Sequence, residues 1–261
     1  MSNTILKKEN IDTIETQKKT EPVLMVSHLY KSFGDNKVLI DFNLKLNKGE
    51  NVVVLGKSGS GKSVLIKCII GLLLPDEGEI HVLGENVVEQ TSSSLDKIRA
   101  KIGFLFQSNA LYDSMTVREN LEFPLRRHWI KNNPDEVNQL VQQALEDVGL
   151  GYTIDMMPVE LSGGMRKRIA LARTLILKPE IILYDEPTTG LDPITGKEII
   201  RLMIHIKEKY NTSSLIISHD MNCVKLAADR IIILLEGKCY AEGDYETLRK
   251  DKDAKVIQFF E

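Results

Sequence analysis

The sequence predicts an α/β fold in which helices cover a mostly parallel sheet. Short runs rich in β-branched residues alternate with amphipathic helical patterns from Val23 onward, which is typical of this class. Three of the runs are apolar without interruption, as expected of strands buried on both faces: residues 52–55, 181–183 and 231–235. The fold therefore has its sheet in the middle and its helices outside.

The remaining elements follow from the same periodicities. β-Branched and apolar runs predict strands at residues 23–27, 38–46, 51–55, 80–82, 102–106, 181–184, 215–218 and 231–235. Helical spacing, often opened by Ser or Pro, predicts helices at residues 63–74, 134–148, 162–177, 193–210 and 221–228. Helical signals dominate residues 111–165, so we expect a helical subdomain inserted between two strands of the sheet.

Domain boundaries follow from the change in composition near Pro22. Residues 1–22 are polar and charged, which predicts a flexible N-terminal tail. We expect a single domain over residues 23–255 and a short C-terminal tail over 256–261. The first residues lack the apolar core of a secretory signal, so export is not expected.

Charge and hydropathy exclude several classes of function. The chain has 34 Lys plus Arg against 37 Asp plus Glu, a net charge of −3, which gives no general attraction for nucleic acid. Its richest apolar stretch, residues 64–74, is interrupted by Lys67 and is too short to span a membrane. Three widely spaced cysteines fit reduced thiols, and therefore the cytosol, better than disulfides or a metal site.

A glycine-rich loop joins the predicted strand 51–55 to the helix that begins at residue 63. Residues 56–63 read GKSGSGKS, the phosphate-loop pattern in its proper context. Its N–H groups and the positive helix end can point at phosphates, while Lys62 supplies charge and Ser63 a hydroxyl for Mg²⁺. An accidental Gly/Ser loop is the alternative. The predicted phosphate contacts are Ser58, Gly59, Ser60, Gly61, Lys62 and Ser63.

Two acidic residues follow the predicted strand 181–184. Ligands of open α/β sheets bind at the carboxyl ends of strands, so Asp185 is well placed to hold Mg²⁺. Glu186 next to it can take a proton from an attacking water. An Asp-Glu pair after a strand is by itself more often a turn or a helix cap. The phosphate loop in the same chain favours the catalytic interpretation.

A second anion site is predicted where residues 161–165 read LSGGM and open an amphipathic helix. Ser162 is the expected N-cap, and a helix start with Gly163 and Gly164 can bind an anion. A single chain does not obviously need two such phosphate sites.

Six motifs in one order resemble those of the ATP-binding subunit of ABC transporters. The resemblance covers residues 23 to about 250. It implies a P-loop NTPase fold with an antiparallel β subdomain and an inserted helical subdomain. It also implies ATP hydrolysis that drives a separate integral membrane permease from the cytoplasmic face of the inner membrane. The motifs are GKSGSGKS at 56–63, Gln107 after a strand, LSGGM at 161–165, ILYDEP at 182–187, GLD at 190–192 and SHD at 218–220.

The resemblance explains the second anion site by a head-to-tail homodimer that holds two ATP molecules with Mg²⁺. The phosphate loop of one copy would face Ser162, Gly163 and Gly164 of the other, and Asp192 would touch the opposite subunit.

Further roles are implied within each copy. Phe33 would stack on adenine with Val38 nearby, although a core aromatic is the alternative for Phe33. Gln107 would complete the Mg²⁺ shell formed with Ser63 and Asp185 and would report the nucleotide state to the permease. The resemblance implies that His219 contacts the γ-phosphate and orients the attack led by Glu186.

A narrower resemblance concerns cargo. Met165 stands where Gln is usual and cannot hydrogen-bond through an amide, and Val64 stands where a second hydroxyl residue often follows. LSGGM and GKSV, together with LFQSNALY at 105–112 and DPIT at 192–195, resemble the ATPases of Mla and Mce-type importers. This implies phospholipid or other lipid cargo and a lipid-binding Mce-type partner.

Two alternatives stay open. The same subunit could serve another cargo, such as a lipoprotein or an amino acid, because cargo is selected outside this chain. A soluble ATPase of this superfamily acting on DNA or ribosomes is the weaker hypothesis. The 123 positions from Lys62 to Asp185 contain neither heptads nor clustered cysteines, so no nucleic-acid partner is expected.

Overall fold

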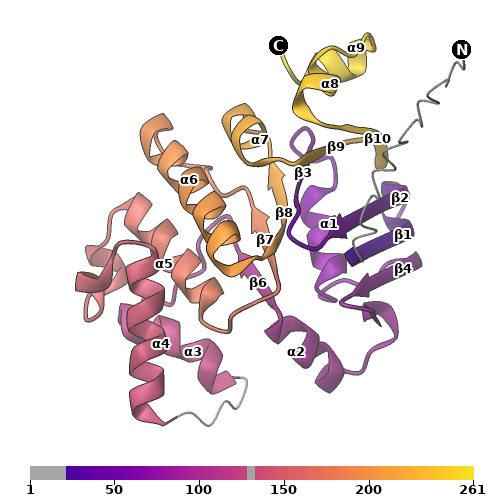
Figure 1. Cartoon of the computed structure of the whole chain (residues 1–261). Helices are drawn as coiled ribbons and strands as arrows, with labels where there is room; N and C mark the ends of the chain where they lie inside the picture. Colours follow the sequence, from indigo (N-terminus) through magenta and orange to yellow (C-terminus); the bar gives the residue numbers. More distant parts are fainter. Residues whose placement is uncertain (1–21, 128–132) are drawn as a thin grey trace, which may run out of the picture.

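The computed structural model describes residues 22–127 and 133–261. Six strands form the central sheet in the order β10-β9-β3-β8-β7-β6 (Figure 1). All neighbours run parallel except β10, which pairs antiparallel with β9 at one edge, so the predicted mostly parallel sheet is confirmed. The strands are β3 (Asn51–Leu55), β6 (Ile102–Leu105), β7 (Ile181–Asp185), β8 (Ser213–Ser218), β9 (Arg230–Leu235) and β10 (Lys238–Gly243).

A second, antiparallel sheet lies beside the central one. Its strands follow the order β2-β1-β4-β5, and the two long ones are joined by a tight turn at Gly34, whose φ is 58°. The expected antiparallel β subdomain is therefore present. The predicted strand 23–27 is only the first part of β1. The strands are β1 (Pro22–Phe33), β2 (Asn36–Asn47), β4 (Glu77–Val82) and β5 (Glu85–Asn86).

The central sheet separates two hydrophobic cores. Successive residues of β3 alternate between them: Val52 and Val54 pack with the antiparallel sheet, whereas Val53 and Leu55 pack with the helices on the other face. Strands β7, β8 and β9 divide their side chains in the same way. Because a strand sends neighbouring side chains to opposite faces, burial on both faces requires an unbroken apolar run. This arrangement explains the runs seen in the sequence.

Helices α3 to α9 contribute to the core on one face of the central sheet, whereas α1 and α2 lie on the side of the antiparallel sheet and pack in its core (Figure 1). Residues 111–165 contain α3 and α4 and, among those described, no strand. In the described ranges no helix combines the length and the apolar character needed to cross a membrane. The helices are α1 (Lys62–Ile69), α2 (Ser92–Ala100), α3 (Val117–Arg127), α4 (Pro134–Asp147), α5 (Gly163–Leu175), α6 (Pro193–Tyr210), α7 (Met221–Ala227), α8 (Tyr245–Arg249) and α9 (Ala254–Ile257).

Helix α1 ends at Ile69, not at the predicted residue 74. Gly71 adopts a φ of 66°, and its N–H donates to the Cys68 carbonyl at 3.0 Å. The Leu72 N–H donates to the Lys67 carbonyl at 2.9 Å. A glycine in this left-handed conformation just beyond the last turn is a common helix stop. The apolar residues after it therefore belong to a turn.

The C-terminal tail predicted for residues 256–261 is wrong. Val256 is only 1% exposed and lies in the helix-side core. Phe259 and Phe260 pack against the same core, and the Phe260 ring meets the Tyr245 ring edge-on at 5.6 Å. These apolar contacts hold the end of the chain on the domain. The N-terminal tail predicted for 1–22 lies outside the described residues except for Pro22, which begins β1.

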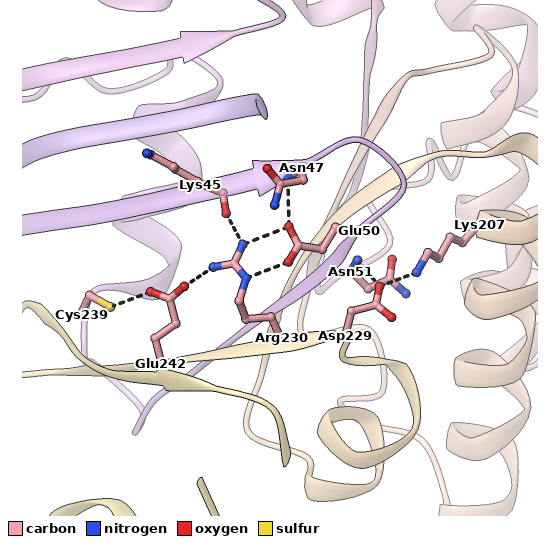
Figure 2. A network of polar contacts seen from close by, with 9 residues as sticks. All are labelled: Lys45, Asn47, Glu50, Asn51, Lys207, Asp229, Arg230, Cys239 and Glu242. Carbon is pink, nitrogen blue, oxygen red and sulfur yellow. Dashed lines mark hydrogen bonds and ion pairs between the residues drawn. The ribbon is translucent and has the colours of Figure 1, made fainter. Parts of the chain in front are cut away.

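A polar network connects the two sheets (Figure 2). Arg230, the first residue of β9, makes two hydrogen bonds to the Glu50 carboxylate, at 2.7 and 3.0 Å. It also donates to Glu242 on β10 and to the Lys45 carbonyl on β2. The neighbouring Asp229 accepts from the Asn51 N–H at 2.7 Å and from Lys207. One guanidinium therefore links β2, the β2–β3 turn, β9 and β10.

We expect Arg230→Met to lower the free energy of unfolding by about 3 kcal/mol, because it leaves the Glu50 carboxylate without its partner. The Arg230 and Glu50 side chains are only 21% and 15% exposed, so water cannot fully replace the lost bonds. Lys250→Met serves as the control, since its ion pair with Glu246 is exposed on both sides and should contribute under about 1 kcal/mol. Urea unfolding measures both changes, and equal losses in the two variants would contradict the prediction.

Candidate nucleotide-binding site

The loop between β3 and α1 is shaped for close approach of a ligand. Gly59 and Gly61 have φ angles of 79° and 103°, in the region that side chains disfavour. A Cβ on Gly61 would lie 2.9 Å from the nearest Val38 methyl, so only glycine fits there. Gly61 also precedes α1 without a side-chain cap, which leaves the N–H groups of the first turn available for an anion.

A cleft of about 770 Å³ opens over this loop. It gathers most of the predicted nucleotide residues from five separate parts of the chain. Ser60 is the exception in the loop, because its hydroxyl is buried and does not line the cleft. Asp185 is also not among the lining residues. The cleft is lined by Phe33, Val38, Lys57, Ser58, Gly59, Gly61, Lys62, Ser63, Val64, Gln107, Glu186 and His219.

Lys62 is the buried cation of the cleft, only 7% exposed. Its Nζ donates to the carbonyl oxygens of Gly56 and Lys57, at 2.7 and 3.0 Å, and lies 3.8 Å from a Glu186 oxygen. Burial lowers the pKa of Lys62, and the carboxylates of Glu186 and Asp185 oppose that shift. Phosphate oxygens could replace the two carbonyls as acceptors.

Glu186 and His219 form a pair across the ends of β7 and β8. His219 Nδ1 lies 2.7 Å from Glu186 Oε2, and the Thr189 hydroxyl lies 3.5 Å from the same oxygen. Glu186 has a φ of 50°, a left-handed backbone conformation that residues other than glycine rarely adopt. Its N–H is fixed by the Ile217 carbonyl at 2.9 Å. Strain of this kind is common where a catalytic side chain must point in one direction.

Asp185 has the properties of a cation ligand. Its Oδ1 is buried and has no hydrogen-bond partner among the described residues. Burial raises the pKa of Asp185, Glu186 raises it further, and Lys62 opposes both. A buried acceptor without a donor is unfavourable unless something else satisfies it. The oxygens of Asp185, Ser63 and Gln107 are hard donors of the type Mg²⁺ prefers, so this set fits that ion.

A separate hollow of about 570 Å³ surrounds the start of α5. It brings together Ser162, Gly163, Gly164 and Asp192, the four residues predicted to act on a second copy. Ser162 caps α5 by accepting from the Met165 N–H at 3.2 Å. Asp192 caps α6, accepting from the backbone of Ile194 and Thr195, each at 3.0 Å. Two helix starts therefore face one hollow that is distinct from the cleft.

The ABC transporter family profile matches residues 39–189, which is more than half of the chain and contains both the loop and the α5 start. The chain belongs to the ABC transporter family. The matched segment lies within its ATPase domain.

Two relatives and one solved structure illustrate the range of this ABC family. The intermembrane phospholipid transport system ATP-binding protein MlaF of Haemophilus influenzae is 38% identical over 91% of this chain and 89% of its own length. The probable ribonucleotide transport ATP-binding protein mkl of Mycobacterium tuberculosis is 40% identical over 90% of this chain but only 65% of its own length. The dimeric ATP-binding cassette MJ0796 bound to ADP and Pi is 32% identical, with a TM-score of 0.77 over 85% of this chain and 98% of that one.

The structure of this ABC ATPase adds residues that sequence reasoning did not select. Lys57 and Val64 line the cleft, and both stand in or next to the loop motif, where their neighbours were already identified. Tyr152, Leu191 and Thr195 join the hollow around α5. Tyr152 precedes the LSGGM motif by nine positions and belongs to no recognisable pattern. Only the folded chain brings it to the hollow.

Proposed function

We propose that two copies of this chain bind two ATP molecules head to tail and hydrolyse them. The observation that carries this proposal is the division of phosphate-binding elements between two surfaces. The cleft has the loop and Lys62, while the hollow has the α5 start with Ser162, Gly163 and Gly164. Arg168 also lines the hollow, but it is already paired with Glu198 at 2.7 Å. In a head-to-tail pair the cleft of one copy would face the hollow of the other. The MJ0796 cassette is described as dimeric with ADP and Pi, which supports this arrangement.

Within each cleft the side chains suit separate parts of ATP. Phe33 is 50% exposed at the end of β1 and offers a ring face for adenine, with Val38 beside it. Lys62 and the loop N–H groups take the phosphates. We assign Ser63, Gln107 and Asp185 to hold Mg²⁺, which when bound supplies charge neutralisation on the phosphate oxygens.

Hydrolysis requires a base for the attacking water. In our proposal the water oxygen bonds to the γ-phosphorus, Glu186 takes the released proton, and the bond from phosphorus to ADP breaks. Glu186 Oε2 is hydrogen-bonded to His219 Nδ1, whereas Oε1 makes only the longer 3.8 Å contact with Lys62 Nζ, so Oε1 is the oxygen we assign to receive the proton. His219 is 64% exposed in its side chain, so its Nε2 remains available to the γ-phosphate.

The partner that the ATPase drives is an integral membrane permease in this proposal, and the chain works peripherally on the cytoplasmic face of the inner membrane. A groove of about 350 Å³ supports a docking face next to Gln107. Two aromatic pairs line it, Phe104 with Phe106 at 4.0 Å and Tyr112 with Phe123 at 4.7 Å between ring centres. Phe106 and Tyr112 are 37% and 42% exposed, and exposed aromatic rings in a cluster mark contact surfaces.

Lipid is the cargo we propose, with a lipid-binding Mce-type protein as a further partner. MlaF, whose name refers to phospholipid transport, aligns with this chain over nearly the full length of both. The relative named for ribonucleotide transport is 40% identical to this chain, but this chain covers only 65% of the length of that relative. A ribonucleotide cargo is therefore the second candidate, ahead of lipoprotein or amino acid.

Isolation of the ATPase from native membranes tests the cargo and the partner together. We expect an integral membrane permease to copurify, with phospholipid as the bound small molecule. The control variant Lys250→Met should retain both, because the Lys250 side chain is 77% exposed. Mass spectrometry identifies the protein and the ligand. A permease that carries nucleotide or amino acid and no lipid would contradict the cargo, and salt-sensitive DNA or ribosome binding without a permease would contradict the transport function.

A further inference from the structure

Helix α5 carries a buried cation that lines neither the cleft nor the hollow. Lys167 is 1% exposed and is one of the largest fully buried side chains of the described residues. Its Nζ donates to the Gln107 carbonyl at 2.9 Å, across 60 positions of sequence. The contact joins the helix that begins at the hollow to the loop that lines the cleft.

A second cation on the same helix holds the next part of that loop. Arg173 donates to the Asn109 carbonyl at 2.8 Å and to the Ala110 carbonyl at 2.6 Å. Asn109 and Ala110 have φ angles of 67° and 49°. Asn adopts this left-handed region comparatively readily, whereas for Ala110 it costs about 1 to 2 kcal/mol. Such strain persists only where surrounding contacts hold it. Three loop carbonyls are therefore fixed to α5 by two cations.

The burial of Lys167 is itself unfavourable. Burial lowers the pKa of Lys167 to about 8, and the Asp185 carboxylate opposes the shift. An apolar side chain of similar length would avoid the loss of hydration. The contacts of the Lys167 ammonium group therefore explain why a charge is buried here. It donates to the Gln107 carbonyl and, at longer range, interacts with the Asp185 carboxylate.

We propose that Lys167 is a positioning residue that makes the start of α5 and the Gln107 loop move as one body, and so couples the two ATP sites of the dimer. Ser162 to Gly164, at the N-terminal end of α5, face the ATP of the partner, whereas Gln107 faces the ATP of its own copy. A change in the position of α5 reaches Gln107 through the Lys167 bond. The inference rests on the proposed head-to-tail dimer.

Lys167→Met tests this coupling, because it keeps the length and apolar stem while it removes the donor. We expect kcat to fall about tenfold with the KM for ATP within about threefold, since the lost bond involves a charged group. The two ATP sites should then act independently, so the Hill coefficient for ATP should approach 1. Backbone amides of residues 106–111 should exchange about tenfold faster in the nucleotide-free protein, a readout that needs neither Mg²⁺ nor turnover. Lys167→Arg keeps a donor and should restore each quantity within about threefold.

Lys207→Met is the matched control, since it removes a lysine that is hydrogen-bonded to Asp229 and lines neither the cleft nor the hollow. It should leave the Hill coefficient and the exchange of residues 106–111 unchanged. If Lys167→Met does not fold, Lys167→Gln takes its place, because the shorter amide also loses the Gln107 contact. Unchanged exchange and an unchanged Hill coefficient in a folded variant would overturn the inference.

The dimer itself is tested separately with Mg-ATP and Glu186→Gln. If that variant stays monomeric, the proposed function fails, while exchange in the nucleotide-free protein still tests the Lys167 contact. If Glu186→Gln dimerises, it is compared with the double variant Glu186→Gln/Lys167→Met. Equal protection of residues 106–111 from amide exchange in the two would contradict only the coupling inference.

Discussion

Glu186→Gln is expected to reduce kcat by about 10² to 10⁴-fold and to leave ATP bound between two copies of the chain, because a positioned base contributes a factor of this size. The amide keeps the shape of the side chain and can still bond His219, whose Nδ1 lies 2.7 Å from Glu186 Oε2. It cannot accept the proton of the attacking water. Binding should therefore survive while hydrolysis stops.

Light scattering with and without Mg-ATP measures the dimer, and phosphate release measures turnover. Glu208→Gln is the matched control, because it makes the same chemical change on the exposed side of α6, away from the cleft and the hollow. Its turnover should stay within about twofold, as expected of a surface substitution. Turnover by Glu186→Gln close to that of the unchanged protein would remove Glu186 from the role of base.

The central sheet is the most predictable part of this fold. Strands β3, β7 and β9 lie inside it, and their unbroken apolar runs reflect burial against two cores. The phosphate loop is equally predictable, since its residue types and its strand-to-helix context are both local. Helix ends depend on single residues, and Gly71 could have shown that α1 stops early.

Elements that depend on distant contacts are harder to predict. Helix α2 begins with three serines and buries only Ile98, so its apolar signal is weak. Arg99 near its end donates to the carbonyls of Ile70 and Gly71, 29 and 28 positions away. The C-terminal residues from Val256 look like a tail because their partners lie elsewhere in the chain. Neither feature has a local pattern.

The same limit applies to the candidate site. Residue types and order indicate Asp185 and Glu186, but the left-handed backbone of Glu186 and the unpartnered Oδ1 of Asp185 follow only from the folded chain. The Lys167 contact joins residues 60 positions apart, and a lysine inside a basic run resembles a solvated surface. Tertiary packing overrides that local pattern.

Lys62→Ala is expected to weaken ATP binding by about a hundredfold or more, because a buried cation that bonds charged phosphate oxygens contributes at the upper end of the hydrogen-bond range. Without nucleotide, Lys62 Nζ donates to the Gly56 and Lys57 carbonyls, so it is already held where the phosphates enter. Burial lowers the pKa of Lys62, which means that its charge is poorly hydrated before ATP arrives. The phosphate oxygens then give Lys62 charged acceptors in place of the two neutral carbonyls.

Titration with a fluorescent ATP analogue measures this loss, and thermal unfolding checks that the variant is folded. Lys97→Ala is the control, since Lys97 on α2 is exposed and does not line the cleft. It should change the affinity by less than about threefold, as a screened surface charge does. Near-normal affinity in folded Lys62→Ala would mean that the loop is not the phosphate site. Because the dimer depends on ATP held in that loop, it would also remove the basis for pairing each cleft with the hollow of a second copy.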